Sequence, residues 1–216
     1  MTMLCGVDEA GRGPVLGPMV IAALAIENEN PLKELGVKDS KKLTAAKREE
    51  ILVRLRECCS IEIVIVTHDQ IDSNSVRSNL NELEAEAFAL AIGRLKAEHV
   101  FVDACDANER HFEEIVMRRL DYRPNMTCCH KADDLYLVVG AASIAAKVTR
   151  DALVKGIADE IGENIGSGYA SDPTTIAFLK KWIRENGDLP PYTRRTWATA
   201  RDILKMSRVR KLSDWD

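Results

Sequence analysis

The feature of this sequence that most restricts its fold is one uninterrupted apolar segment, Met19–Ile26 (MVIAALAI). A short continuous apolar run of this kind is typical of a buried strand. A membrane-spanning helix needs about 18 such residues in a row, and the sequence has no run of that length, so we expect no membrane contact. We also expect no signal peptide, because the first residues lack a basic patch followed by an apolar stretch. A chain of 216 residues is long enough for one well-buried core with a modest appendage.

Strand and helix patterns alternate along most of the chain. Thr44 and Asp172 are suited to cap helices, and Pro173 is suited to a first helical turn. The order is strand, turn, strand, then alternating helices and strands, then helices alone. This order predicts a layered α/β core at residues 1–165 and a small helical part at residues 166–216. The expected strands are 4–8, 19–26, 61–67, 99–103 and 125–130, and the expected helices are 45–58, 81–96, 111–120, 135–155, 174–186 and a basic C-terminal helix.

Acidic residues recur where predicted strands end or helices begin. Asp8 and Glu9 follow the first strand, Asp103 ends a central strand, and Asp133 opens a long helix. Ligands of open α/β sheets gather at strand ends, so these side chains are expected to meet if their strands are neighbours. Clustered carboxylates repel one another unless a cation neutralises them, and Mg²⁺ and Mn²⁺ prefer oxygen ligands. The pattern therefore predicts a divalent-metal site of the kind that activates water for phosphodiester hydrolysis.

The net charge and the cysteine content indicate what kind of protein carries such a site. The net charge of −4 argues against a protein that coats nucleic acid in bulk, although not against a nuclease with a local basic surface. Segment 194–211 is strongly basic, and we expect it to face nucleic acid. The six cysteines form no CxxC pair, which predicts a reduced cytoplasmic protein without a zinc site. The basic residues of the segment are Arg194, Arg195, Arg201, Lys205, Arg208, Arg210 and Lys211.

A glycine-rich turn, Gly11-Arg12-Gly13, follows the first acidic pair. Glycine lets a backbone approach a ligand closely, and the guanidinium of Arg12 offers a fork of donors for phosphate or ribose oxygens. The spacing to Gly17 is GxGxxxG, and a strand follows it. The dinucleotide fingerprint instead requires GxGxxG followed by a helix. We therefore expect a turn that reads a substrate, and not a site for a nucleotide cofactor.

Taken together, these motifs resemble the ribonuclease HII family. The resemblance is carried by VDEAGRGPVLGPMV at 7–20, DSKKLT at 39–44, FVDACD at 101–106, KADD at 131–134, AASIAAKVTRD at 141–151 and GSGYASDPTT at 166–175, and it covers roughly residues 3–200. The residues of two motifs, SKKLT at 40–44 and KAD at 131–133, are more similar to archaeal members of the family than to bacterial ones. The resemblance implies a ribonuclease H-like mixed β-sheet flanked by helices, with a small helical C-terminal part.

The activity that this resemblance implies is hydrolysis of the RNA strand of RNA–DNA hybrids with Mg²⁺ or Mn²⁺ as the cofactor. It also implies cleavage on the 5′ side of ribonucleotides embedded in duplex DNA, which leaves a 3′-hydroxyl and a 5′-phosphate. We expect a monomer. Two rivals stay open at this point. A non-catalytic nucleic-acid-binding module would bind without a metal, and another polynucleotidyl transferase of the same fold, such as a resolvase, would share the chemistry.

Site residues follow from the resemblance motif by motif. Asp8, Glu9 and Asp103 match the family's metal-binding acids, and Asp133 matches its fourth active-site acid. Asp106 is the alternative to Asp103, and Asp134 the alternative to Asp133. The expected substrate contacts are Gly11, Arg12 and Gly13 at the ribose 2′-hydroxyl through backbone atoms, Tyr169 against the ribose at the junction, and Lys41, Ser143 and Lys147 along the nucleic-acid backbone.

Overall fold

A computed structural model describes residues 2–75 and 80–213 of the chain. Within these ranges, five strands form one mixed sheet in the order β3-β2-β1-β4-β5. β1 pairs antiparallel with β2 and parallel with β4, β2 pairs antiparallel with β3, and β4 pairs parallel with β5. The strands are β1 (Leu4–Ala10), β2 (Met19–Ile26), β3 (Ser60–Val66), β4 (His99–Asp103) and β5 (Asn125–Cys129).

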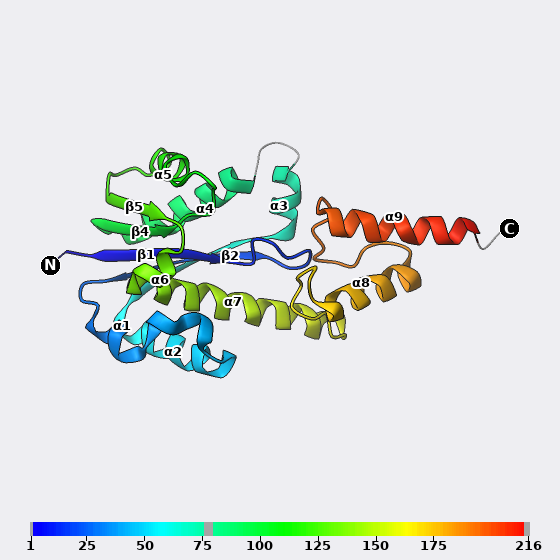
Figure 1. Ribbon diagram of the computed structural model, residues 1–216, viewed down its shortest axis with the longest axis horizontal. Coiled ribbons are helices and arrows are strands. Elements are labelled where there is room, and N and C mark those ends of the chain that lie inside the picture. The colour runs from blue at the N-terminus through cyan, green and yellow to red at the C-terminus, as the bar shows by residue number, and fades with distance from the viewer. Residues whose placement is uncertain (1, 76–79, 214–216) are drawn as a thin grey trace.

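Helices cover both faces of this sheet (Figure 1). α4 (Leu80–Leu95) and α5 (Glu109–Met117) lie on one face, and α1 (Asn30–Leu35), α2 (Ala45–Cys58) and α7 (Leu137–Ile161) lie on the other. Every residue of β2 is buried between them, which explains why its sequence is apolar throughout. Gly6 lets α7 approach β1 closely, because a Cβ there would lie 2.1 Å from the backbone carbon of Val138. Short helices complete the core: η1 (Val37–Lys42), α3 (His68–Ser75) and α6 (Ala132–Leu135).

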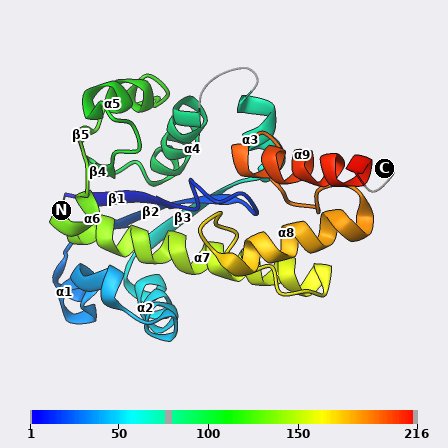
Figure 2. The ribbon, with the colours of Figure 1, turned by 45° about the vertical axis from the view of Figure 1, so that its right-hand side comes forward.

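The C-terminal helices α8 (Pro173–Asn186) and α9 (Ala198–Ser213) lie beyond the end of the sheet (Figures 1 and 2). Their apolar side chains share a cluster with Val154 and Ile157 of α7 and with Val15 and Leu16 of the β1–β2 loop. The helical part is therefore packed against the loop that follows the acidic pair. The division of the chain after residue 165 stays a prediction.

The expected caps are present. Thr44 accepts a hydrogen bond from the Lys47 amide at 3.2 Å, and Asp172 accepts one from the Thr174 amide at 2.9 Å with Pro173 in the first turn. Among the helices that the structure describes, none combines the length and hydrophobicity that a membrane crossing requires.

Several expected boundaries were wrong, and two of the differences bear on the site. β1 continues to Ala10, so Asp8 and Glu9 lie within the strand, because pairing with Ala22 and Ile21 of β2 extends past the apolar residues. The long helix predicted at 135–155 is α7, which begins at Leu137 and continues to Ile161. Asp133 does not open it but lies on the separate short helix α6, because Tyr136 between the two is extended at φ −119° and ψ 124°. The sequence analysis missed α1, η1 and α3, which are too short for a clear apolar period.

Candidate metal centre and substrate groove

Three acidic side chains from separate parts of the chain meet at one end of the sheet. Carboxylate oxygens of Asp8, Asp103 and Asp133 all lie within 4.8 Å of one another. Asp8 and Asp103 come together because β1 and β4 are parallel neighbours, with Val7 opposite Val102. Asp133 reaches them from α6, which follows the next strand, β5. Asp8 and Asp133 are buried and Asp103 is partly buried.

The electrostatics of this cluster favour a bound cation. Burial raises the pKa of Asp8 well above its ordinary value, and the charge of Glu9 raises it further. Burial, then repulsion from Glu9 and Asp133, raises the pKa of Asp103 from 3.8 to about 6. The Lys41 ammonium lies 2.8 Å from Asp133. This lysine side chain is 61% exposed, so solvent screens its charge. Buried, closely spaced carboxylate oxygens are the donor set that Mg²⁺ and Mn²⁺ prefer, so the residues present fit such an ion.

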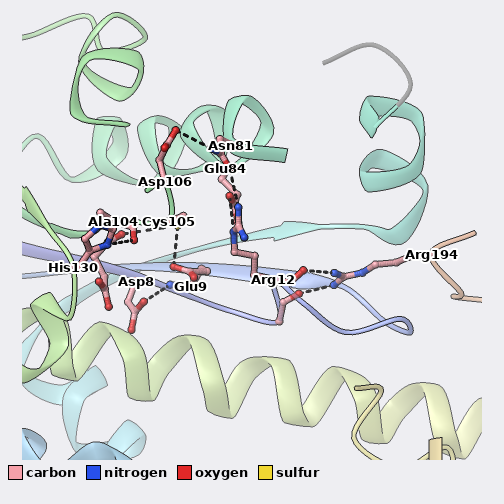
Figure 3. A network of polar contacts seen from close by, with 12 residues as sticks. Asp8, Glu9, Arg12, Asn81, Glu84, Ala104, Cys105, Asp106, His130 and Arg194 are labelled. Atoms are coloured by element: carbon pink, nitrogen blue, oxygen red, sulfur yellow. Dashed lines mark hydrogen bonds and ion pairs between the residues drawn. The ribbon is translucent and has the colours of Figure 1, made fainter. Parts of the chain in front are cut away.

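Glu9 lies beside the three-acid cluster and not within it. Successive side chains of a strand point to opposite faces, so Glu9 is directed away from the face that Asp8 occupies. Its Oε2 accepts a hydrogen bond from the Cys105 thiol at 3.2 Å, and its backbone N–H donates to Asp8 Oδ1 at 2.7 Å (Figure 3). Burial raises the pKa of Glu9, and the Cys105 hydrogen bond opposes that rise.

The two alternative acids have other contacts. Asp106 accepts hydrogen bonds from Asn81 at 2.8 Å and from the Asn108 backbone N–H at 2.9 Å, and it pairs with His111. These contacts lower its pKa, the Asn108 bond most of all. Asp134 has a side chain that is 51% exposed, and it pairs with Lys41 at 3.3 Å. The geometry therefore favours Asp103 over Asp106 and Asp133 over Asp134.

The glycine turn is held from both sides. Its Arg12 guanidinium lies 2.8 Å from Glu84 of α4, and a second nitrogen donates to Asn81 at 2.7 Å. Arg194 donates from three nitrogens to the carbonyls of Gly17, Arg12 and Gly11 at 3.0, 2.8 and 2.6 Å. The sequence analysis expected the Arg12 side chain to meet phosphate or ribose oxygens, but the structure places its guanidinium on α4. The loop backbone remains as the part of this turn that is able to approach a ribose.

Only glycine fits at position 11. Gly11 has a φ of 88°, and a Cβ there would lie 2.2 Å from the Nε of Arg150. Arg150 is buried, donates to the Ser167 carbonyl at 3.2 Å, and has its guanidinium 5.1 Å from the Tyr169 ring centroid. The glycine turn and Tyr169 are therefore held against the same buried arginine.

The basic C-terminal segment does not act as one surface. Arg194 is fully buried, and burial lowers its pKa to about 9, so its predicted role in facing nucleic acid was wrong. Arg195 pairs with Asp188 at 2.8 Å, and Arg201 and Lys205 are exposed. A nucleic-acid-facing role for the exposed residues stays a prediction. The side chains of Arg208, Arg210 and Lys211 lie outside the described residues.

A groove of about 390 Å³ adjoins the acidic cluster and gathers the predicted substrate residues. Ser143 lines this groove and lowers the pKa of Asp8, and Lys147 pairs with Asp151 at 2.6 Å. The sequence analysis missed Arg48 of α2, which also borders the groove. The residues that line it are Glu9, Ala10, Gly11, Arg12, Gly13, Lys41, Arg48, Ser143, Ile144, Lys147 and Tyr169.

Three buried charged residues that shape the site were also missed. Glu84 and Arg150 occupy core-facing positions of otherwise apolar helix faces, and Arg194 lies in the loop before α9. For Glu84 and Arg150, a charge at an apolar helical position was the available signal. The buried position of Arg194 was missed because this residue belongs to a basic segment that the sequence analysis assigned to the surface.

Comparisons with known proteins point to one family. The family model described as Ribonuclease HII matches residues 5–200. A Ribonuclease HII from Methanocorpusculum labreanum is 44% identical over 98% of this chain and 99% of its own length, and one from Thermococcus onnurineus is 45% identical over 93% and 89%.

Solved structures are similar as well. The ribonuclease H2 of Pyrococcus horikoshii OT3 has a TM-score of 0.90 and 42% identity, covering 96% of this chain and 99% of its own. The RNase HII of Archaeoglobus fulgidus, solved in a complex with PCNA, has a TM-score of 0.85 and 38% identity, covering 93% and 96%. Bst-RNase HIII, solved with Mn²⁺, shares the fold at a TM-score of 0.81 and 20% identity, covering 96% of this chain and 71% of its own.

Proposed function

The chain belongs to the ribonuclease HII family and is a metal-dependent ribonuclease H endonuclease, and from this premise we propose that Asp8, Glu9, Asp103 and Asp133 hold its divalent cation. The observation that carries the proposal is the meeting of Asp8, Asp103 and Asp133 within 4.8 Å. Glu9 adjoins them and lines the groove together with the predicted substrate residues. Mg²⁺ and Mn²⁺ both suit these ligands.

The chemistry is hydrolysis of a phosphodiester in a ribonucleotide-containing duplex. When bound, a divalent cation activates a water and stabilises the charge of the leaving oxygen. Ser143 lowers the pKa of Asp8 and so favours the charged form of this ligand. Lys41, Arg48 and Lys147 border the groove and supply positive charge for substrate phosphates.

Specificity for RNA comes from the glycine turn and Tyr169. The ribose 2′-hydroxyl is the group that distinguishes RNA from DNA. The Gly11–Gly13 backbone meets this hydroxyl, and Tyr169 stacks on the ribose at the junction. Water attacks the phosphorus on the 5′ side of the ribonucleotide and the 3′-oxygen leaves, which gives a 3′-hydroxyl and a 5′-phosphate. The protein acts as a monomer on RNA–DNA hybrids and on ribonucleotides embedded in duplex DNA.

The test uses a DNA duplex that carries one ribonucleotide, with and without EDTA, followed by mapping of the cut. Asp8→Asn and Asp103→Asn should each lower kcat/KM at least about a hundredfold, because a lost metal ligand costs several kcal/mol of transition-state stabilisation. Asp133→Asn should behave alike, whereas its exposed neighbour in Asp134→Asn should stay within about threefold of wild type, as surface changes do. Near-wild-type cleavage by folded Asp8→Asn would refute the assignment.

A further inference from the structure

Arg12 has two carboxylates in its surroundings, Glu84 and Glu9. Its Nε is 2.8 Å from Glu84 Oε1, and it lines the same groove as Glu9. Glu84 is fully buried on α4, and the Arg12 side chain is 39% exposed. Because Arg12 and Glu9 line the same groove, the direction of the Arg12 guanidinium decides which of the two acids it neutralises.

The structure fixes that direction toward α4 (Figure 3). Glu84 binds one side of the guanidinium, and Asn81 accepts from a second nitrogen at 2.7 Å. Asn81 is itself oriented, because its side-chain amide donates to Asp106 at 2.8 Å. Asp106 in turn pairs with His111 of α5 at 3.0 Å. A continuous series of polar contacts therefore connects α5 to the guanidinium.

The shape of the glycine turn does not depend on this pair alone. Arg194 holds the carbonyls of Gly11, Arg12 and Gly17 from the opposite side. Neutralising Glu84 therefore leaves the backbone of the turn anchored and chiefly changes the direction of the Arg12 side chain. Without the attraction of Glu84, Arg12 still faces the carboxylate of Glu9, which lines the same groove beside the three-acid cluster.

We propose that Glu84 is a positioning residue that holds Arg12 away from Glu9 and so leaves Glu9 available to a divalent cation. The inference rests on the proposed function, because it takes Glu9 to belong to the metal centre. An arginine paired with Glu9 competes with the cation for the same oxygens. Neutralising Glu84 should therefore weaken metal binding even though Glu84 contributes no ligand to the three-acid cluster.

The experiment measures Mn²⁺ binding to the full chain at pH 8 without substrate, by titration calorimetry and by the electron paramagnetic resonance signal of free Mn²⁺. Glu84→Gln keeps the side-chain shape and should raise the Kd roughly fivefold, as expected for one partly exposed ion pair in competition. Glu82→Gln is the matched control. It lies on the same helix, pairs with Arg119 away from the site, and should bind Mn²⁺ as wild type does.

A double variant separates charge competition from a packing role. Arg12→Gln combined with Glu84→Gln removes the competing cation together with its anchor, so the Kd should return to within about twofold of wild type. Wild-type binding by folded Glu84→Gln, or a double variant as weak as the single one, would overturn the inference. If Glu84→Gln fails to fold by circular dichroism, Asn81→Ala replaces it and should also weaken binding, whereas unchanged binding overturns the inference.

Failure of the proposed function has a different signature. If Glu9→Gln leaves the Mn²⁺ affinity of the otherwise wild-type chain unchanged, Glu9 is not part of the metal centre. The inference about Glu84 then falls with it. If Glu9→Gln weakens binding and Glu84→Gln does not, the metal centre stands and only the positioning role is lost.

Discussion

The acidic cluster predicts that removing one of its charges stabilises the metal-free protein while abolishing its activity. Asp103→Asn tests this prediction most directly. Asparagine keeps the shape of the side chain and the Oδ1 atom that accepts a hydrogen bond from the Ala132 amide at 3.4 Å. It removes the charge that Glu9 and Asp133 repel. Asp103→Asn therefore isolates the electrostatic cost of the site.

The magnitude follows from the pKa of Asp103, which burial and its acidic neighbours raise from 3.8 to about 6. Two pKa units correspond to about 3 kcal/mol, and solvent screening of a partly exposed group reduces this to about 1–2 kcal/mol. Below the unfolded pKa both states are protonated and the cost is absent. Between the two pKa values the folded state retains a proton that the unfolded state has lost. Stability therefore falls as pH rises through this window, and the full cost is present above the folded pKa.

Urea denaturation in EDTA provides the measurement. At pH 8 the Asp103→Asn variant should be more stable than wild type by about 1–2 kcal/mol, and near pH 4 the difference should almost vanish. Saturating Mn²⁺ should narrow the gap, because the ion binds the wild-type folded state more tightly. Asp106→Asn is the control with the opposite sign, since its contacts lower the pKa of Asp106 and its removal should destabilise the protein at pH 8. An Asp103→Asn variant less stable than wild type in EDTA at pH 8 refutes the reasoning.

Two further predictions concern Tyr169, which is proposed to contact the ribose, and Arg194, which holds the glycine turn. Tyr169→Ala should lower kcat/KM at a single embedded ribonucleotide about tenfold or more, measured against a continuous hybrid; unchanged junction cleavage would assign Tyr169 a packing role only. Arg194→Lys should lower the free energy of unfolding by about 2–4 kcal/mol in urea, because one ammonium cannot satisfy the three carbonyls that Arg194 holds. Loss of less than about 0.5 kcal/mol would contradict the anchoring role.

Much of the sheet was predictable because its strands have simple patterns. β2 is apolar at every position, and β4 occurs at the predicted residues. A run of apolar residues was therefore enough to predict each of these strands. The sequence also indicated that Asp8 and Asp103 stand near the ends of strands. It did not give the strand order, because the neighbour of β1 is decided by how the helices pack and not by a local pattern. The opposite direction of Glu9 follows from the extension of β1 beyond its apolar residues, which the sequence analysis ended too early.

Arg194 shows why charge pattern alone misled the sequence analysis. A guanidinium buried beside apolar helices is costly unless every donor finds an acceptor, and a turn that exposes several carbonyls is what satisfies it. Those carbonyls belong to residues 11, 12 and 17, far away in the sequence, so no local signal connects the two segments. The same contact connects the helical C-terminal part to the turn that follows the strand carrying Asp8 and Glu9. The turn between these acids and β2 is thus fixed from α4 through Glu84 and from the C-terminal part through Arg194. For this reason the proposed metal centre and the turn proposed to read the ribose form one unit with Arg194, which comes from the opposite end of the chain.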